Sequence, residues 1–473
     1  MRAWRRPHDQ VCVMRAGNPS RRCARDFAVC KLSRVQFKGK SMRRFIVFCL
    51  ALSFAISVVS AIHASPTSQP SSDVERIAAA AVPIDGDADL DHVLKAIGNA
   101  RIVMIGEPWH GDGAAIALRA RLVKRLHEKA GFDVLAFEND FFATHEAWAA
   151  VERGGDVRSS FKDEVWSFWI KTAVAAPLWD YIDSQARASR PLRVAGFDHQ
   201  LSGRLSATGL ARQLEPRLAA LPGVSAAQAR SAAATLHAAL QGKPNSSTAA
   251  QYDELAALLA RLERETADPF WRQVAESVRR NIEGDGRDAV MGDNLVWLAT
   301  VQYPRNRIIV WAHNNHILAN PKTFTTSPDP MVRASLQNLS PDQIASITYT
   351  GAEVRRVLGP DMYTIATVSH TGAYSTDIPA ALRRGPPDAP QADFSLRATL
   401  AAAPEGTVEA ALAARGPGLQ FVDLRPLPLT GPVRSRVLDY TTLPPVLLRL
   451  ETGYDGLLFV RETYPLTGRQ GGG

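Results

Sequence analysis

Short apolar runs alternate with longer amphipathic stretches along the chain from about residue 75. Seven runs have the length of β-strands and are mostly bounded by Gly, Pro, Asn or Asp: 102–105, 134–137, 192–197, 307–312, 363–368, 419–424 and 457–460. Their hydrophobicity is continuous rather than alternating, which predicts strands that are buried on both faces. The pattern therefore predicts an α/β fold, with a largely parallel central sheet flanked by helices.

One long stretch, about 201–299, departs from this alternation. It is rich in Ala, Leu, Arg and Glu and contains few helix-breaking residues. We expect it to form an all-helical insertion or subdomain, in which residues 242–247 join two of the helices by a turn.

Positive charge is concentrated at the start of the chain. The formal net charge is +8, but residues 1–44 hold thirteen Lys and Arg and two acids, which leaves about −3 for the remainder. A basic protein of this size would ordinarily suggest nucleic acid as a partner. Because the basic residues belong to the leader, the pattern excludes nucleic acid and favours a small-molecule partner.

An internal methionine, Met42, begins a segment with the features of a secretory signal peptide. Arg43 and Arg44 supply the positive region, residues 45–61 supply the apolar region, and Val59-Ser60-Ala61 offers a cleavage site. A membrane anchor is the alternative, but the run is short for a bilayer span and a Ser/Thr/Pro linker follows it.

The leader therefore predicts a domain plan and a location. We expect an untranslated or disordered Arg-rich leader at 1–41, a signal peptide at 42–64, a linker at 65–80 and an α/β domain at 81–473. The protein would be periplasmic or secreted, with no stable membrane insertion after cleavage.

All four cysteines lie in the leader, at Cys12, Cys23, Cys30 and Cys49. The mature chain would contain none. It therefore could form no disulfide bond and would offer neither a thiol nucleophile nor a thiolate metal ligand.

Ionisable residues follow four of the apolar runs: Glu107, Glu138, Asp198 and His313. The carboxyl ends of parallel strands face one crevice, where ligands bind, so these side chains are expected to meet. Each residue alone could be a helix N-cap or part of a polar turn. Four such endings together favour a functional site, because clustered buried charges are costly.

Three further residues lie on the segments that leave these strands. His110 and His316 follow the first and fourth of these runs, and Arg119 lies on the helix after the first loop. They extend the same predicted site.

Several of these residues belong to motifs that resemble the erythromycin esterase family. The motifs are "GEPWHG" at 106–111, Arg119, "FEND" at 137–140, the "WSFW" region, "GFD" at 196–198, "RD" at 287–288, "DNLVWL" at 293–298 and "WAHNNHI" at 311–317. The resemblance covers about 95–465, and the combination is specific for the family but not for one substrate.

The resemblance implies metal-independent hydrolysis of a macrolide lactone, without a cofactor. His110 would act as general base on water, because imidazole titrates near neutral pH. Glu107 or Glu138 would orient the imidazole. The candidates to stabilise the oxyanion are Arg119, His313 and His316.

Two positions differ from the family's usual pattern. Trp109 stands where a small or hydroxyl residue is common, and Asp112 where Thr is common. We expect Trp109, at the mouth of the site, and Asp198 to contact the substrate. The bulky indole predicts an ester that can differ from erythromycin.

Two other functions remain open from the sequence. The first is a metal site or a metal-dependent hydrolase, since imidazoles and carboxylates suit zinc, iron or manganese. Its ligands would come from His110, His313, His316, Glu107 and Glu138. The second is a periplasmic binding protein without turnover, which would need the crevice but not the full set of charged residues.

Overall fold

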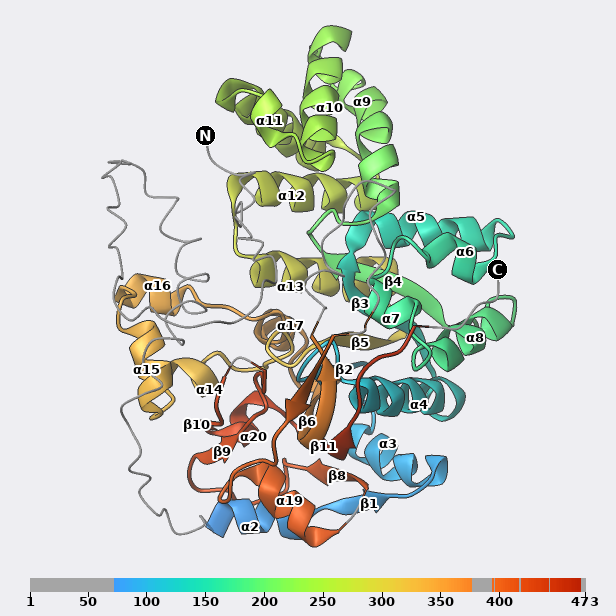
Figure 1. Ribbon diagram of the computed structural model, residues 1–473. Coiled ribbons are helices and arrows are strands. Elements are labelled where there is room, and N and C mark those ends of the chain that lie inside the picture. The colour runs from blue at the N-terminus through green and yellow to red at the C-terminus, as the bar shows by residue number, and fades with distance from the viewer. Residues whose placement is uncertain (1–71, 377–393, 395, 417, 442, 469–473) are drawn as a thin grey trace, which may run out of the picture.

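A mixed sheet of nine strands runs through the middle of the molecule (Figure 1). The computed structural model describes residues 72–376, 394, 396–416, 418–441 and 443–468. The sheet order is β1-β8-β11-β6-β2-β5-β3-β4, and β7 pairs with β6. Its strands are β1 Val82–Ile84, β2 Ile102–Glu107, β3 Phe132–Asp140, β4 Arg193–Asp198, β5 Arg307–His313, β6 Met362–Ser375, β7 Arg397–Leu400, β8 Leu419–Asp423 and β11 Gly456–Thr463. β9 Val433–Ser435 and β10 Val446–Leu448 form a separate antiparallel pair.

The six strands from β11 to β4 are parallel, as the sequence predicts. β8 and β1 add antiparallel strands at one edge, and β7 is antiparallel to β6. All seven predicted strands are present. The four strands that the sequence analysis missed, β1, β7, β9 and β10, have three or four residues each and are too short for a periodic signal.

Helices account for most of the remaining described chain. They are α2 Ser72–Ala79, α3 Asp91–Ile97, α4 Gly113–Ala130, α5 Phe141–Glu152, α6 Val157–Phe161, α7 Ser167–Ile170, α8 Ala176–Gln185, α9 Ala211–Ala219, α10 Ala226–Leu240, α11 Ala249–Glu265, α12 Pro269–Glu283, α13 Arg287–Trp297, α14 Lys322–Thr325, α15 Pro330–Leu336, α16 Pro341–Ala345, α17 Thr350–Leu358, α19 Val408–Arg415 and α20 Leu450–Gly453.

Both faces of the sheet are covered, which explains the continuous hydrophobicity of its strands. Met104 and Val310 face a core shared with α9 to α13, α17 and α19. Val103, Ile309 and Trp311 face the other core, which α3, α4 and α6 to α8 complete. The predicted α/β class, with helices flanking a largely parallel sheet, is confirmed.

The predicted helical insertion is also confirmed. Helices α9 to α12 extend beyond the sheet at the top of Figure 1. Ser225 and Thr248 form capping boxes with Gln228 and Gln251 at the starts of α10 and α11. These caps satisfy backbone N–H groups that a helix start leaves without partners, so local sequence defines where both helices begin.

The start of the described chain differs from the expected linker. Ser72–Ala79 forms α2, which places Val74, Ile77 and Ala78 in the core and packs against α19. Residues at that spacing lie on one face of a helix. Burial of this apolar face stabilises α2, although the polar composition of the segment predicted a linker. The predicted leader, the signal peptide and the four cysteines lie outside the described residues.

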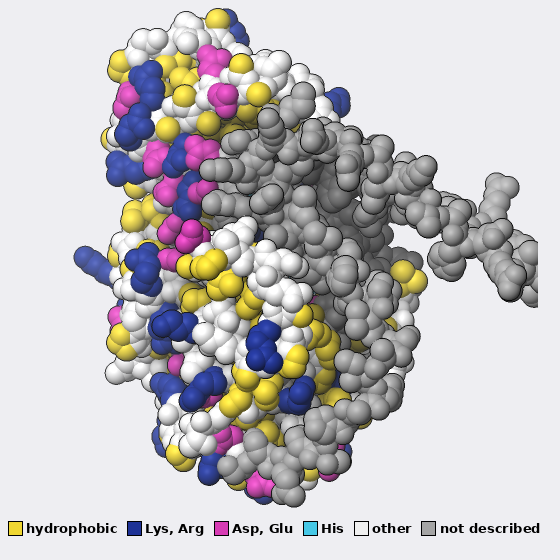
Figure 2. Space-filling view, turned by 90° about the vertical axis from the view of Figure 1, so that its left-hand side faces the viewer, with side chains coloured by type: hydrophobic (Ala, Val, Ile, Leu, Met, Phe, Trp, Pro, Cys, Tyr) yellow, Lys and Arg dark blue, Asp and Glu magenta, His cyan; other side chains and the backbone are white. Residues whose placement is uncertain are grey.

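Acidic and basic side chains are interspersed on the surface. Figure 2 shows Lys and Arg next to Asp and Glu on one face, with hydrophobic side chains between them. Within the described ranges, no helix combines the length and the apolar character needed to cross a membrane.

Candidate active site

Four ionisable residues lie at the carboxyl ends of neighbouring strands. Glu107 and His313 close β2 and β5 and are paired in register. The backbone N–H of His313 donates to Glu138 Oε2 on β3 over 2.9 Å. Asp198 closes β4, beside β3. The strand order β2-β5-β3-β4 therefore brings together residues that follow four separate apolar runs in the sequence.

Glu107 and His110 form a close pair. His110 Nδ1 lies 2.6 Å from Glu107 Oε1, and because a carboxylate only accepts, we assign the proton to Nδ1. The basic nitrogen is then Nε2, to which the described residues form no hydrogen bond. Burial lowers the pKa of His110 to about 4, so the imidazole is neutral at pH 7. His110 thus presents an oriented, neutral imidazole.

Aromatic rings hold the imidazole of His110 in place. The ring stacks on Phe168, with centroids 4.8 Å apart, and meets Trp169 edge-on. Trp169 Nε1 also donates to Glu107 Oε1 over 3.1 Å. Helix α7 therefore fixes both members of the pair, while 16% of the His110 side chain stays exposed.

Arg119 lies behind Glu107 and has no exposed surface. Its guanidinium forms an ion pair with Glu107 Oε2 and lies 3.8 Å from the centroid of the Trp311 ring. The prediction that Arg119 could contact an oxyanion does not fit this placement, because burial leaves it no path to a substrate. Arg119 instead balances the charge of Glu107 and holds the carboxylate in position.

His313 is also neutral and fully engaged. Its Nε2 lies 3.0 Å from Pro108 O and therefore donates, while Nδ1 accepts from Asn315 N–H over 3.2 Å. Burial lowers its pKa to about 4. Neither nitrogen is left for an oxyanion, which differs from the expected role. The ring packs edge-on against His110, with centroids 5.5 Å apart.

A second cluster centres on Arg287, the first residue of α13. Its guanidinium donates to both oxygens of Asp198, the closest at 2.6 Å, and to Glu138 Oε1 over 2.7 Å. Burial alone would lower the pKa of Arg287, but Asp198 and Glu138 outweigh it and raise that pKa. The Arg287 side chain is 28% exposed, and its guanidinium is charged at any working pH.

His316 completes this cluster as a cation. Its Nδ1 lies 2.8 Å from Asp288 Oδ1, and its Nε2 lies 3.2 Å from Glu138 Oε1. Burial opposes the charge, but Asp288 and Glu138 raise the pKa of His316 to about 10. Arg287 Nη1 approaches His316 Nε2 to 3.1 Å. Both nitrogens then carry protons, so no hydrogen bond forms between the two cations, and Glu138 Oε1, which lies against both, screens their charges.

Glu138 is the shared anion of the site. Burial alone would raise its pKa, but His316 and Arg287 hold the pKa well below its usual range. Its second oxygen accepts from the backbone of His313. Glu138 forms no hydrogen bond to His110 in the described structure, so of the two carboxylates it is Glu107 that contacts the imidazole.

The two residues expected to contact substrate differ in exposure. Trp109 is half-buried beside His110, and its Nε1 donates to Ser375 O over 2.8 Å. Asp198 has no exposed surface, and both of its oxygens accept from Arg287. Substrate contact by Asp198 therefore does not fit the structure, because Arg287 covers its carboxylate.

Asp112 has a structural role. Its Oδ1 caps α4 by accepting from Ala115 N–H over 2.8 Å, and its Oδ2 accepts from Ser369 and Tyr440 over 2.7 and 2.9 Å. The carboxylate thus ties the start of α4 to β6 and to the Tyr440 segment. It is fully buried.

Sequence reasoning missed Arg287 and Asp288 as site residues. Both stand in the "RD" motif, which the resemblance includes, at the start of a helix in the insertion. No apolar strand precedes them, so the strand-end argument could not find them. The motif itself was the available signal.

A metal centre receives no support from the geometry. Within the described ranges, no group of three or more His, Cys, Asp or Glu side chains is arranged to hold a metal ion. His316 lies between two carboxylates as an imidazolium, and both ring nitrogens of His313 are engaged, so neither offers a lone pair.

Comparison with known proteins identifies a family that matches most of the chain. The model of the erythromycin esterase family matches residues 127–463, a stretch that includes the Arg287 cluster and begins after His110. The Bacillus subtilis (strain 168) protein YbfO, which is named as a hydrolase, is 27% identical over 314 residues, or 57% of this chain and 69% of its own.

Three solved structures share the fold at low sequence identity. A succinoglycan biosynthesis protein has a TM-score of 0.61 and 16% identity over 85% of this chain and all of its own. A Bacillus cereus protein has a TM-score of 0.57 and 17% identity over the same shares. A mutant of the erythromycin esterase EreC in its open conformation has a TM-score of 0.55 and 16% identity, over 81% of this chain and 96% of its own.

The family match extends over most of the chain, and the fold is the one that these structures share. The chain belongs to the erythromycin esterase family of hydrolases.

Proposed function

We propose that the protein hydrolyses a carboxylic ester or a macrolide-like lactone, with water activated by His110. One observation carries the proposal: the 2.6 Å contact between Glu107 and His110 Nδ1, which leaves Nε2 of a neutral imidazole without a partner in the described structure. A base for water needs this combination of orientation and an available lone pair.

In the proposed reaction, His110 Nε2 takes a proton from water as the water oxygen bonds to the ester carbonyl carbon. The carbonyl π electrons move to oxygen and form a tetrahedral oxyanion. When this intermediate collapses, the C–O bond to the alcohol breaks and the imidazolium returns its proton to the leaving oxygen. The products are an acid and an alcohol, which for a lactone are parts of one opened chain.

Arg287 and His316 are the groups best suited to stabilise the oxyanion. Both are cationic, and 28% and 15% of their side chains are exposed. Asp198, Glu138 and Asp288 hold them in place before substrate arrives, so little reorganisation accompanies the reaction. Arg119 and His313, by contrast, position Glu107 and His110.

Glu107 would also stabilise the imidazolium that forms during the reaction. Its negative charge lies next to the ring, and Arg119 keeps the carboxylate fixed. Trp109 would contact the substrate beside His110 and limit the shape of the ester. No metal or cofactor takes part in the proposed steps.

We also propose that the protein is exported through a signal peptide that starts at Met42 and is periplasmic or secreted. The charged, apolar and small-residue regions at 42–61 support this. N-terminal sequencing of protein from the periplasm or medium checks it. A mature chain that begins before Met42 contradicts the proposal.

The catalytic proposal is tested by incubating the purified protein with simple esters and macrolides and identifying products by mass spectrometry. We expect addition of one water to the substrate and loss of turnover in His110→Ala with the fold retained. A variant that keeps its activity removes His110 from the mechanism. Activity that chelation abolishes and one metal ion restores would favour the metal-dependent alternative, and binding without turnover would favour the binding protein.

A further inference from the structure

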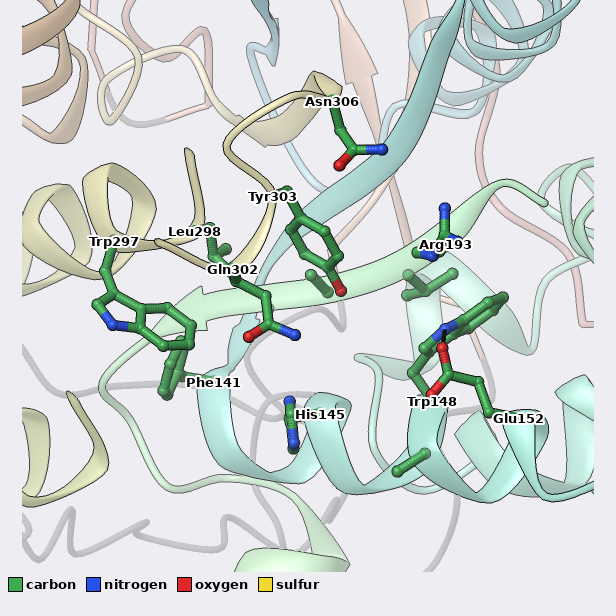
Figure 3. A pocket seen from close by; sticks show the side chains of 14 residues that line it. Phe141, His145, Trp148, Glu152, Arg193, Trp297, Leu298, Gln302, Tyr303 and Asn306 are labelled. Carbon is green, nitrogen blue, oxygen red and sulfur yellow. Dashed lines mark hydrogen bonds between the residues drawn. The ribbon is translucent and has the colours of Figure 1, made fainter. Parts of the chain in front are cut away.

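A cavity of about 330 Å³ lies beside β4, the edge strand of the sheet (Figure 3). Helix α5 forms one wall, β4 another, and the segment from the end of α13 to Asn306 forms the third. None of the residues of the candidate active site lines it. Its volume is at the lower end for ligand pockets, which begin at roughly 300 Å³. The cavity suits a small ligand or a short chain segment.

Aromatic rings make up the inner wall. Phe141, Trp148 and Trp297 are buried in the protein and contribute to the lining, and Tyr303 projects into the cavity from the opposite side (Figure 3). Four rings around one space provide a large apolar surface for a ligand group. A bulky apolar or aromatic group would therefore fit here.

The backbone of β4 supplies the polar wall, and strand alternation shows which groups face the cavity. Asn314 N–H donates to Glu107 O over 2.8 Å. In a parallel sheet the backbone groups of successive residues point alternately to the two neighbouring strands, so those of Asn314, and of every second residue before it, point to β2. The backbone groups of Trp311 therefore point to β3. Trp311 is opposite Phe137, and its backbone groups bond to the residues on either side of Phe137. The backbone groups of Phe137 itself therefore point the other way, to β4. Because Phe137 is opposite Gly196, its bonds reach the residues on either side of Gly196.

The N–H and C=O groups of Gly196, and of Val194 two residues earlier, consequently face away from β3. Both residues line the cavity. β4 is the last strand of the sheet, and the described structure gives these outward groups no partner. They form a donor–acceptor ladder of the kind that an added strand completes.

The remaining polar groups are compatible with an uncharged backbone. Burial lowers the pKa of His145, which stacks on Phe270 with centroids 3.7 Å apart. Glu152 Oε1 accepts from Trp148 Nε1 over 2.9 Å at the rim. The two charged side chains that line the cavity, Arg193 and Glu152, have partners in Asp133 and Trp148, so neither requires an ionic ligand.

We propose that this cavity binds a short extended peptide, which adds a strand to β4 and places a large apolar side chain among the four rings. The outward N–H and C=O groups of Val194 and Gly196 are two residues apart, which is the spacing of the backbone groups that an added strand presents on one side. A sugar or an organic cation lacks backbone groups at this spacing, so the ladder favours a peptide. The proposal is independent of ester hydrolysis, because no residue of the candidate active site takes part.

The test uses the purified protein and the capped peptide acetyl-Ala-Trp-Ala-amide. Amide hydrogen exchange is followed by NMR at Val194 and Gly196. We expect saturating peptide to slow exchange at both amides by about tenfold or more. The same peptide N-methylated at its backbone amides cannot complete the ladder and should leave exchange unchanged.

Two variants locate the binding. Ala149→Leu fills the cavity from α5 and should weaken peptide affinity by about tenfold or more. Ala150→Leu, the next residue of α5 and also half-buried, does not line the cavity and should bind normally. If Ala149→Leu fails to fold, Tyr303→Ala removes part of a wall instead and should likewise weaken binding.

Four outcomes overturn the proposal. They are no binding of the capped peptide, equal binding of the N-methylated peptide, full affinity in the folded cavity variant, and protection of Val194 and Gly196 by methyl glucoside or tetramethylammonium but not by peptide. Slowed exchange at both amides, lost in the cavity variant and kept in Ala150→Leu, supports it.

Discussion

Glu107 Oε1 and His110 Nδ1 lie 2.6 Å apart, and this contact determines which nitrogen of His110 can accept a proton. The carboxylate accepts a hydrogen bond from the Nδ1 N–H, so the lone pair is on Nε2. Glu107 itself is held by Arg119 and Trp169 in a part of the protein without solvent. The orientation of the base therefore depends on a buried network rather than on the loop that carries His110.

Glu107→Gln should lower kcat for ester hydrolysis by about 10⁴-fold, the scale of the equivalent change in a Ser–His–Asp triad. A glutamine amide can donate to Nδ1, which moves the imidazole proton to Nε2 and removes the base. The kcat is measured with p-nitrophenyl butyrate, and circular dichroism monitors the fold. Glu152→Gln, at an exposed glutamate outside the site, is the matched control and should keep its kcat. Equal rates in the two variants would show that Glu107 does not orient the base.

The pH dependence of kcat/KM should show a broad plateau with two limbs. His110 works as a base only when neutral, so activity should fall as pH drops through its pKa of about 4. His316 stabilises the oxyanion only when protonated, so activity should fall as pH rises through its pKa of about 10. Initial rates at subsaturating ester between these extremes check both limbs.

His316→Gln provides the control for the alkaline limb. It keeps a side chain that can donate to one carboxylate but cannot titrate. The variant should have a lower kcat/KM throughout, with no fall near pH 10 and an unchanged acid limb. An alkaline limb that persists in this variant would assign it to another group.

Arg119→Ala should lower the free energy of unfolding by about 3–5 kcal/mol, because it leaves the buried carboxylate of Glu107 without its cation. Arg125→Ala, on the same helix, removes a surface pair with Asp91 and should change stability little. Urea unfolding of both variants measures the difference. Similar midpoints for the two would show that the pair between Arg119 and Glu107 contributes no more than a surface pair.

The sequence was sufficient to predict the strands that position the site. Buried parallel strands read as continuous apolar runs, and Glu107, Glu138, Asp198 and His313 follow four of them. Their meeting requires only that the strands be neighbours, which parallel α/β topology favours. The short strands at the edges lack such a signal, since they depend on tertiary pairing rather than on their own pattern.

Side-chain roles could not be predicted in the same way. Sequence spacing gives no depth, so Arg119, which lies behind Glu107, could not be distinguished from Arg287, which is partly exposed. Nor could spacing show that His313 has both nitrogens engaged while His316 lies between two carboxylates. These differences arise from how α13 and the segment after β5 pack together.

Arg287→Lys should lower kcat/KM by about 10²-fold or more while leaving the fold intact. Lysine keeps the charge but cannot contact Asp198 with two nitrogens and Glu138 at once, so the cation loses its fixed direction. Arg280, on α12, forms an ion pair with Asp285 outside the site. Arg280→Lys makes the same change there and should have no effect on kcat/KM. Equal activity of the two variants would exclude Arg287 from transition-state stabilisation.

Trp109→Ala should change substrate preference more than catalytic chemistry. The indole lies beside the His110 ring, with centroids 6.4 Å apart, and is held there by its bond to Ser375 O. Removing it opens space next to the base without touching Glu107, so kcat/KM for a bulky macrolactone should rise relative to that for p-nitrophenyl acetate. The ratio of the two values in the variant and the wild type measures the effect. Because His110 keeps its partner, a parallel loss on both esters would mean that Trp109 supports the imidazole and does not shape the substrate site.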